Sequence, residues 1–180
     1  MVNKKAQVWV ETVVYTLIGI VLIGVVLAVA TPTITKQKDK ITISKSVDMM
    51  IDLDNTISNV ETYVGTRKNF DMKISNGVLS IDGIDDKITF EIDDSKYAYS
   101  EPGKTIKLSQ NLEVKTSEKS GKYIILLTLD YDNKLNMTIK GIDTKKQYTK
   151  NSLGYVVSIS NKGITSGQTL QKIDFEELNY

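Results

Sequence analysis

Residues 12–35 form a run of 24 residues without a charged side chain. As an α-helix this run would span about 36 Å, more than the hydrocarbon core of a bilayer, which is about 30 Å thick. The fold must therefore accommodate a helix of membrane length that is apolar on all sides. One acidic residue, Glu11, stands immediately before the run, and Lys4 and Lys5 lie upstream of it. Placing a carboxylate in hydrocarbon costs free energy, so the position of Glu11 beside the apolar run needs a physical explanation.

The composition excludes several classes of function. The 180 residues suffice for one domain of ordinary size with an appendage. The chain contains no Cys and no His, which removes thiol nucleophiles, Cys/His zinc sites and the commonest general base. The net charge is +1 and Arg67 is the only Arg, so neither nucleic-acid binding nor a bidentate phosphate clamp is indicated. Since the sequence also lacks a phosphate-binding loop and a dinucleotide motif, we expect no enzyme activity and no cofactor.

Helical periodicity extends from residue 7 to about residue 66. After the apolar run, hydrophobic residues recur every three or four positions among polar ones, which is typical of an amphipathic helix. These residues are Val47, Met50, Ile57, Val60 and Val64. Pro32 is expected to kink this helix without ending it, although a break there or in residues 41–44 would also fit. Gly65 is expected to end the helix, and one face of a β-sheet can cover its apolar side.

From residue 70 onward the hydrophobic period changes to two, which indicates β-strands. The segment 70–83 fits a hairpin with a two-residue turn at Asn76–Gly77. The paired residues would be Ile74 with Leu79 and Met72 with Ile81.

A second hairpin is predicted in residues 123–141, with a three-residue loop at 132–134. The paired residues would be Tyr131 with Leu135, Leu129 with Met137 and Leu127 with Ile139. Because Ile124 and Leu126 lie on the other face of the first strand, that strand is expected to be central, with both faces covered. In all, the pattern predicts eight to ten short strands, hence an α+β fold with a long N-terminal helix and an antiparallel, sandwich-like β-rich head.

The N-terminal arrangement consists of two Lys, a small residue, a Gln, three further residues, a Glu and the unbroken apolar run. It resembles the class III signal peptide of type IV pilin-like proteins, most closely that of archaeal pilins. The resemblance covers residues 1–35, and beyond them the order of a long helix and a β-rich head agrees. It implies a prepilin peptidase that cuts between Ala6 and Gln7, after the basic leader. Glu11 would then be the fifth residue of the mature chain, where the family usually carries a glutamate.

The resemblance also divides the chain into four parts. Residues 1–6 would be the leader, 7–35 the transmembrane and filament-core helix, 36–67 its amphipathic extension and 68–180 the globular head. It implies a structural subunit that resides in the membrane before assembly and then polymerises with itself in a cell-surface filament. The prepilin peptidase and a pilus assembly machinery would be its partners.

Glu11 has a physical role in such a filament. Cleavage after Ala6 would create a new α-amino group on Gln7. Where apolar helices pack away from water, this amine and the Glu11 carboxylate, of the same or of adjacent subunits, can neutralise each other. Because an unpaired buried charge is strongly penalised, the pair would also select the register of packing. The simpler interpretation is an interfacial glutamate that the membrane edge tolerates.

Two other interpretations of the N-terminal segment remain open. Ala28-Val29-Ala30 is similar to the cleavage site of a secretory signal, which would release a secreted β-domain beginning at Thr31. An uncut helix would instead anchor a surface β-domain with a binding or adhesion role. The native N-terminus distinguishes the three interpretations, since it would be Gln7, Thr31, or the intact Met1 or Val2.

Three further residue patterns resemble functional sites. Asn136-Met137-Thr138 is the only N-glycosylation sequon, and Asn136 is expected to point outward from its strand. Asp130 and Asp132 faintly resemble a calcium loop but lack the Gly and the distal Glu of such loops, which favours a polar turn and no metal site. The lysines that follow the apolar run are expected to contact lipid head groups or a neighbouring subunit; they are Lys36, Lys38 and Lys40.

Overall fold

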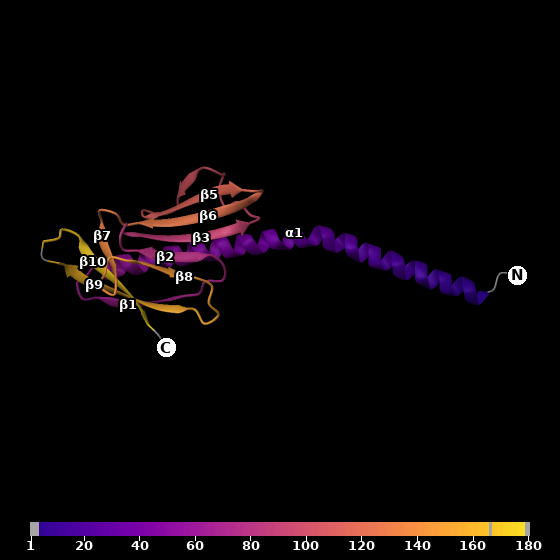
Figure 1. The fold of residues 1–180 in the computed structure, drawn as a ribbon, viewed down its shortest axis with the longest axis horizontal. Helices are drawn as coiled ribbons and strands as arrows, with labels where there is room; N and C mark the ends of the chain where they lie inside the picture. The colour runs from indigo at the N-terminus through magenta and orange to yellow at the C-terminus, as the bar shows by residue number, and fades with distance from the viewer. Residues whose placement is uncertain (1–3, 166, 179–180) are drawn as a thin grey trace. The chain divides into compact units, whose positions relative to one another are not determined.

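The computed structural model describes residues 4–165 and 167–178, and within them it contains one α-helix and ten β-strands (Figure 1). The helix α1 runs from Lys4 to Glu61 and continues through Pro32, as expected. The strands are β1 (Arg67–Met72), β2 (Val78–Asp82), β3 (Lys87–Ser95), β4 (Thr105–Lys107), β5 (Leu112–Lys119), β6 (Lys122–Asp130), β7 (Leu135–Ile139), β8 (Lys145–Tyr148), β9 (Tyr155–Ile164) and β10 (Gln171–Leu178). By its contacts the chain divides into two units, Met1–Lys38 and Asp39–Tyr180.

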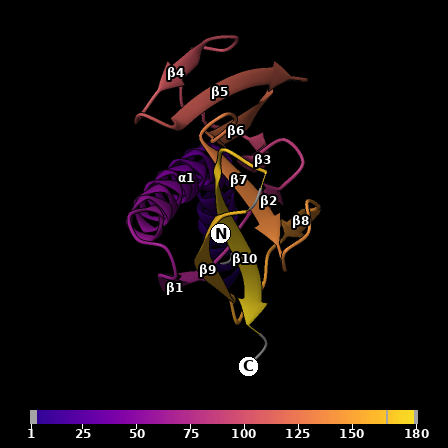
Figure 2. The ribbon, with the colours of Figure 1, turned by 90° about the vertical axis from the view of Figure 1, so that its left-hand side faces the viewer.

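The strands form two sheets within the second unit. The four-stranded sheet has the order β1-β9-β10-β7, and the six-stranded sheet has the order β4-β5-β6-β3-β2-β8. All strand pairs are antiparallel except β10 with β7, which is parallel. Figure 2 shows the second half of α1 packed against both sheets. The predicted α+β class with a β-rich head is therefore confirmed, as is the number of strands.

The amphipathic half of α1 forms one layer of the hydrophobic core. Its buried side chains are Ile43, Val47, Met50, Leu53, Ile57 and Val60. Their spacing of three or four residues keeps them on one side of the helix, where they meet buried residues such as Phe90 of β3 and Phe175 of β10. The prediction that Val64 belongs to this face is wrong: α1 ends at Glu61, and Val64 is exposed.

The hairpin predicted for residues 70–83 does not form. β1 pairs with β9 over six residue pairs, and β2 pairs with β3 over five. The connection at Asn76–Gly77 therefore carries the chain from one sheet to the other. Gly77 has a φ of +99°, and a Cβ there would lie 2.5 Å from the carbonyl oxygen of Glu91. The glycine thus permits the start of β2 to approach β3 closely. A glycine is needed at this position for that close approach, and not for the hairpin turn that the sequence predicted.

The second predicted hairpin does not form either. β6 is an interior strand, as expected, with β3 on one edge and β5 on the other. Because both edges are occupied, β7 cannot pair with β6 and crosses to the other sheet, where it lies parallel to β10. Residues 131–134 form the turn that crosses to the other sheet, and in this turn Asn133 has a φ of +59°. The second face of β6 is only partly covered, since Ile124 and Leu126 are half-buried.

A buried polar cluster fastens α1 to the six-stranded sheet. The carboxylate of Asp54 accepts hydrogen bonds from the Tyr131 hydroxyl at 2.6 Å, from Asn111 Nδ2 at 2.9 Å and from Ser109 Oγ at 3.2 Å. Burial and the Asp54 carboxylate raise the pKa of the Tyr131 hydroxyl, which keeps it protonated as a donor. A carboxylate at this position of the apolar helix face is thus tolerated because all three donors converge on it.

The C-terminal end of α1 is capped from the four-stranded sheet. Asn161 of β9 donates from Nδ2 to the carbonyl oxygens of Val60 and Glu61, both at 3.0 Å. Its Oδ1 accepts the backbone N–H of Gly163 at 2.8 Å. These bonds satisfy carbonyls that a helix end otherwise leaves without an intrahelical partner. The prediction that Gly65 ends the helix is wrong, since α1 ends at Glu61; Gly65, with a φ of +84°, instead lies in the turn that leads into β1.

Candidate assembly surface

The first half of α1 exposes apolar side chains on every side. From Val8 to Ile34, the large hydrophobic residues are 45–73% exposed, with Trp9 the most exposed of them. Single apolar residues on a surface are common, but an uninterrupted apolar surface of this length is not stable in water. α1 is therefore a long apolar N-terminal helix whose length and composition fit a membrane span or a signal sequence.

The threonine hydroxyls of this half are hydrogen-bonded within the helix and need no water as a partner. Each hydroxyl donates to the backbone carbonyl four residues earlier, at 2.7–3.3 Å; the residues are Thr12, Thr16, Thr31, Thr33 and Thr35. Such internal bonds satisfy polar groups in surroundings without water. The polar side chains of the apolar run are therefore compatible with lipid and with a dry contact between helices.

The glycines and the proline of the apolar half leave the helix surface open. A Cβ added at Gly19 or Gly24 would meet no atom within 4 Å. Pro32 has no N–H to donate to the carbonyl of Ala28, yet the helix continues to Glu61. Neither glycine is therefore required by a close contact with another described residue. Small residues of this kind allow close approach when a second helix packs against the first.

The predicted cleavage and assembly residues all lie in α1. Glu11 is exposed on the helix surface of the isolated chain. Lys4, Lys5, Ala6 and Gln7 belong to the first turns of α1, but their side chains lie outside the described part of the structure. Gln7 and Glu11 are four residues apart and so lie one helical turn from each other. The roles that the sequence assigned to these five residues stay predictions.

Asn136 has a more covered setting than its sequence suggested. It lies on the face of β7 opposite the buried Met137, but its side chain is half-buried, and Oδ1 is buried without a hydrogen-bond partner among the described residues. Thr138, the third residue of the sequon, is fully buried and donates its hydroxyl to Asp174 at 2.8 Å. Glycosylation of Asn136 stays a prediction, and in the folded head a glycosylating enzyme would meet a sequon with a buried threonine.

The segment that faintly resembles a calcium loop forms the turn between the sheets. Asp130 Oδ1 accepts the backbone N–H of Asp132 at 3.1 Å, and Asp130 Oδ2 lies 3.6 Å from the Lys87 amine. Both contacts use the carboxylate within the protein. In residues 4–165 and 167–178, no three His, Cys, Asp or Glu side chains are grouped as metal ligands.

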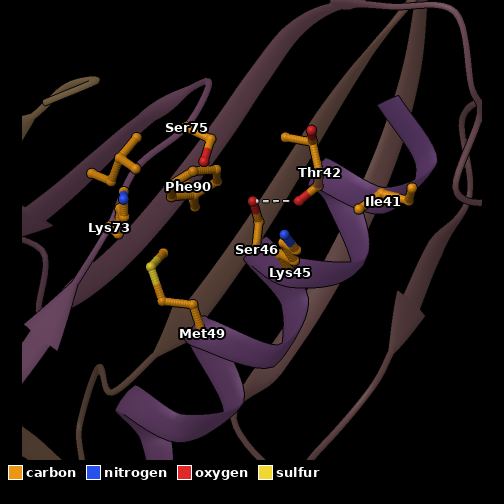
Figure 3. Close-up of a pocket in the computed structure, with 9 residues that line it drawn as sticks. Ile41, Thr42, Lys45, Ser46, Met49, Lys73, Ser75 and Phe90 are labelled. Carbon is orange, nitrogen blue, oxygen red and sulfur yellow. Dashed lines mark hydrogen bonds between the residues drawn. The ribbon is translucent and has the colours of Figure 1, made fainter. Parts of the chain in front are cut away.

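Figure 3 shows a pocket of about 100 Å³ between α1 and the connection from β1 to β2. It is lined by Ile41, Thr42, Lys45, Ser46, Met49, Lys73, Ile74, Ser75 and Phe90. The Ser46 hydroxyl donates to the Thr42 carbonyl at 2.9 Å, so it is already satisfied within the helix. Pockets that bind small organic ligands usually measure about 300–1,000 Å³, and this one is below that range. We assign it no ligand.

No family model, no curated protein and no solved structure matches this chain. The function is therefore inferred from the sequence and structure of the chain itself. A long N-terminal apolar helix followed by largely antiparallel β-sheets is consistent with a pilin-like architecture.

Proposed function

We propose that this chain is a structural subunit of a type IV pilus-like filament on the cell surface, of the archaeal kind. The observation that carries the proposal is the composition of α1. One half supplies a buried face to the head, while the other half is apolar on all sides and uncovered in the single chain. A helix of this kind can lie in a membrane before assembly and in the dry centre of a helical polymer afterwards, which explains why its surface is apolar throughout.

The N-terminal residues support this proposal over a simple anchor. Lys4 and Lys5 would hold the leader at the cytoplasmic face, and a prepilin peptidase would cut between Ala6 and Gln7. The new amine of Gln7 and the carboxylate of Glu11 would then neutralise each other among packed helices. In this proposal the chain performs no catalysis and needs no cofactor. Its partners are further copies of itself, the peptidase and the assembly machinery.

The N-terminus of the native surface protein tests the proposal. Intact mass and N-terminal sequencing of a sheared surface fraction should give a chain that begins at Gln7. An intact start at Met1 or Val2 would favour the alternative of an anchored surface domain, and a start at Thr31 would favour a secreted one. A variant with Lys4→Glu and Lys5→Glu should keep its leader and disappear from the sheared fraction. A double exchange of two exposed head lysines, Lys107→Glu with Lys115→Glu, is the matched control and should be cut normally.

A further inference from the structure

The central strand β6 has one covered face and one open face. Ile125, Leu127 and Leu129 are fully buried in the core that the sheets share with α1. The alternate residues of the strand point to the opposite side of the sheet, where Ile124 and Leu126 are only half-buried. We call this opposite side of β5, β6 and β3 the outer face. The sequence predicted that both faces of the strand are covered, and the single chain leaves the outer face open to a further molecule.

The outer face is acidic along one side and basic along the other. Figure 1 shows β6 between β3 and β5, and in the register of these strands Leu126 lies between Glu91 of β3 and Lys115 of β5. Because neighbouring strands are about 4.8 Å apart, the two charged residues are about 10 Å apart at the backbone. Toward one end of the face, Asp93 and Lys119 line a hollow on either side of Ile124. All four charged residues are exposed.

These four charges are not paired within the chain. In residues 4–165 and 167–178, none of them takes part in an ion pair within 4.0 Å. Glu91 has neutral residues beside it on both neighbouring strands. Lys115 has Glu113 two residues before it without forming an ion pair, and Lys119 lies opposite another lysine, Lys122. The acidic and the basic side of the outer face are therefore available to charges of a second molecule.

A second copy of the chain carries the matching charges. Sheets that pack face to face keep their strands nearly aligned and about 10 Å apart. A half-turn about an axis parallel to β6 places β6 on β6 and places β3 of each copy on β5 of the other. Glu91 of each copy then meets Lys115 of the other, and Leu126 meets Leu126. A half-turn about an axis across the strands would instead oppose like charges, so the charges select the first arrangement.

We propose that the outer face of β5, β6 and β3 docks against the same face of a second copy and forms a two-fold symmetric dimer. The contact uses one surface on both copies, so it closes at two chains. The occupant is a second copy because this one surface carries both signs in an arrangement that complements itself. The dimer does not require the filament function, since an anchored surface domain with the same head would present the same face.

The area of the outer face predicts a weak dimer. β3, β5 and β6 are eight or nine residues long. At about 3.3 Å per residue and about 4.8 Å per strand, the three strands present roughly 400 Å² per copy. Stable complexes bury about 800 Å² per partner. The dimer should therefore form where the chains are concentrated, as in a membrane, and dissociate in dilute solution.

Cross-linking of the full-length protein in phosphatidylcholine liposomes tests the contact. The chain contains no Cys, so Leu126→Cys introduces a single thiol. In the dimer this thiol lies on the two-fold axis, beside the same thiol of the other copy, and a short thiol-reactive cross-linker should join the two. Thr128→Cys, on the same face of β6, is a second reporter and should also be joined. Asn69→Cys, at an exposed position of the other sheet, is the control and should give no dimer.

Charge exchange identifies the surfaces that meet. Glu91→Lys and Lys115→Glu, each combined with Leu126→Cys, oppose like charges at both symmetric contacts. Each should lower the cross-linked fraction about tenfold. A mixture of the two variants in the same liposomes should restore it. The two exchanged side chains then meet with opposite signs, and the second contact keeps its native pair.

A control and three outcomes complete the test. Lys68→Glu with Leu126→Cys changes the net charge on the exposed part of β1 and should cross-link as Leu126→Cys alone does. The dimer is disproved if neither reporter is joined, if either charge exchange is joined as well as its parent, or if the mixture is no better than its components. None of these results affects the filament function, which the native N-terminus tests separately.

Discussion

At the scale of single residues, the environment decides what each carboxylate does. Asp48 and Asp52 are exposed, whereas Asp54, two residues further along the helix, is buried and accepts three hydrogen bonds. Glu11 lies on the apolar half of the helix, where hydrocarbon or other helices would replace water. Asp86 is half-buried beside other carboxylates. Each setting leads to a different measurable consequence.

Removing the Asp54 carboxylate should destabilise the head. Asp54→Ala leaves the buried Tyr131 hydroxyl without its acceptor and also frees donors of Asn111 and Ser109. We expect a loss of about 2–4 kcal/mol in the free energy of unfolding, measured by urea denaturation of a fragment comprising Asp39–Tyr180. Asp52→Ala, at an exposed position of the same helix, is the control and should change stability by less than about 0.5 kcal/mol.

Asp86 should make the head less stable as the pH rises. Burial, and then the nearby carboxylates of Asp143, Asp132 and Asp82, raise the pKa of Asp86 against the opposing hydrogen bond from the Met137 N–H. The folded state therefore binds the Asp86 proton more tightly than the unfolded state does. Ionisation costs stability as the pH rises from about 4, the ordinary value, through the raised pKa.

The comparison of Asp86→Asn with the wild type measures this cost. The variant keeps an oxygen for the Met137 N–H and cannot ionise, so its advantage in unfolding free energy should be absent below about pH 3 and should grow toward pH 7. Asp85→Asn, at the exposed neighbouring position, should show a smaller pH-dependent change. A constant difference between Asp86→Asn and the wild type from pH 3 to pH 7 would contradict the assignment.

Replacing Glu11 should separate charge recognition from hydrophobic packing. Glu11→Gln keeps the size of the side chain and removes its charge, so it should be cut normally and enter filaments poorly. Glu11→Val should insert into the membrane better, because the cost of desolvating a carboxylate is gone. It should still assemble poorly, since the Gln7 amine of a neighbour would lack a partner. Wild-type ratios of filament to membrane pool for both variants would leave Glu11 as an acid that the membrane edge tolerates.

At the scale of elements, α1 belongs to two different environments. Its second half is held in the head at several points: by its buried apolar face, by the Asp54 cluster and by the Asn161 cap. Its first half exposes apolar side chains and satisfies its threonine hydroxyls internally. The end of the helix is thus capped by a side chain from β9, about a hundred residues away in the sequence.

Loss of the Asn161 cap should loosen the end of α1. Asn161→Ala removes the bonds to the Val60 and Glu61 carbonyls and leaves the Gly163 N–H without its acceptor. Since these groups are largely buried, we expect a loss of about 2–3 kcal/mol in unfolding free energy. Hydrogen exchange should increase in the last turn of α1 before it increases in β3 or β6. Asn69→Ala, at an exposed position of β1, is the control and should leave both measurements unchanged.

At the scale of the whole molecule, the second half of α1 supplies one layer of the core of the head. The contacts place the boundary between the two units after Lys38, so residues from Asp39 onward belong with the sheets. A head that begins at residue 68 lacks the helix layer and with it six buried apolar side chains. Each such side chain contributes about 1.5–3 kcal/mol, and a domain has a total stability of about 5–15 kcal/mol.

Two fragments test this dependence. The fragment 39–180 should be soluble and should unfold in one cooperative transition, because it retains the helix layer and leaves out the apolar run. The fragment 68–180 should expose the apolar faces of both sheets, bind a hydrophobic dye and show no cooperative transition. Circular dichroism during heating distinguishes the two. Equal melting temperatures would mean that the helix layer contributes nothing to the core.

The sequence by itself determined those features that depend on near neighbours. The 24-residue uncharged run predicted the long apolar helix, and alternation predicted the strands, since the period of the hydrophobic residues records which face is buried. The basic residues, Ala6, Gln7 and Glu11 suggested processing and assembly, and these assignments come from the sequence alone.

Only the tertiary structure decided which strands are partners. Both predicted hairpins failed because a pattern of period two states which side chains are buried and does not state which strand edge is free. The edges of β6 are occupied by β5 and by β3, although β3 is more distant in sequence than β7, and β7 therefore joins the other sheet. The Asp54 cluster, the Asn161 cap and the burial of Thr138 likewise join residues far apart in sequence, whose contacts arise only when the layers pack.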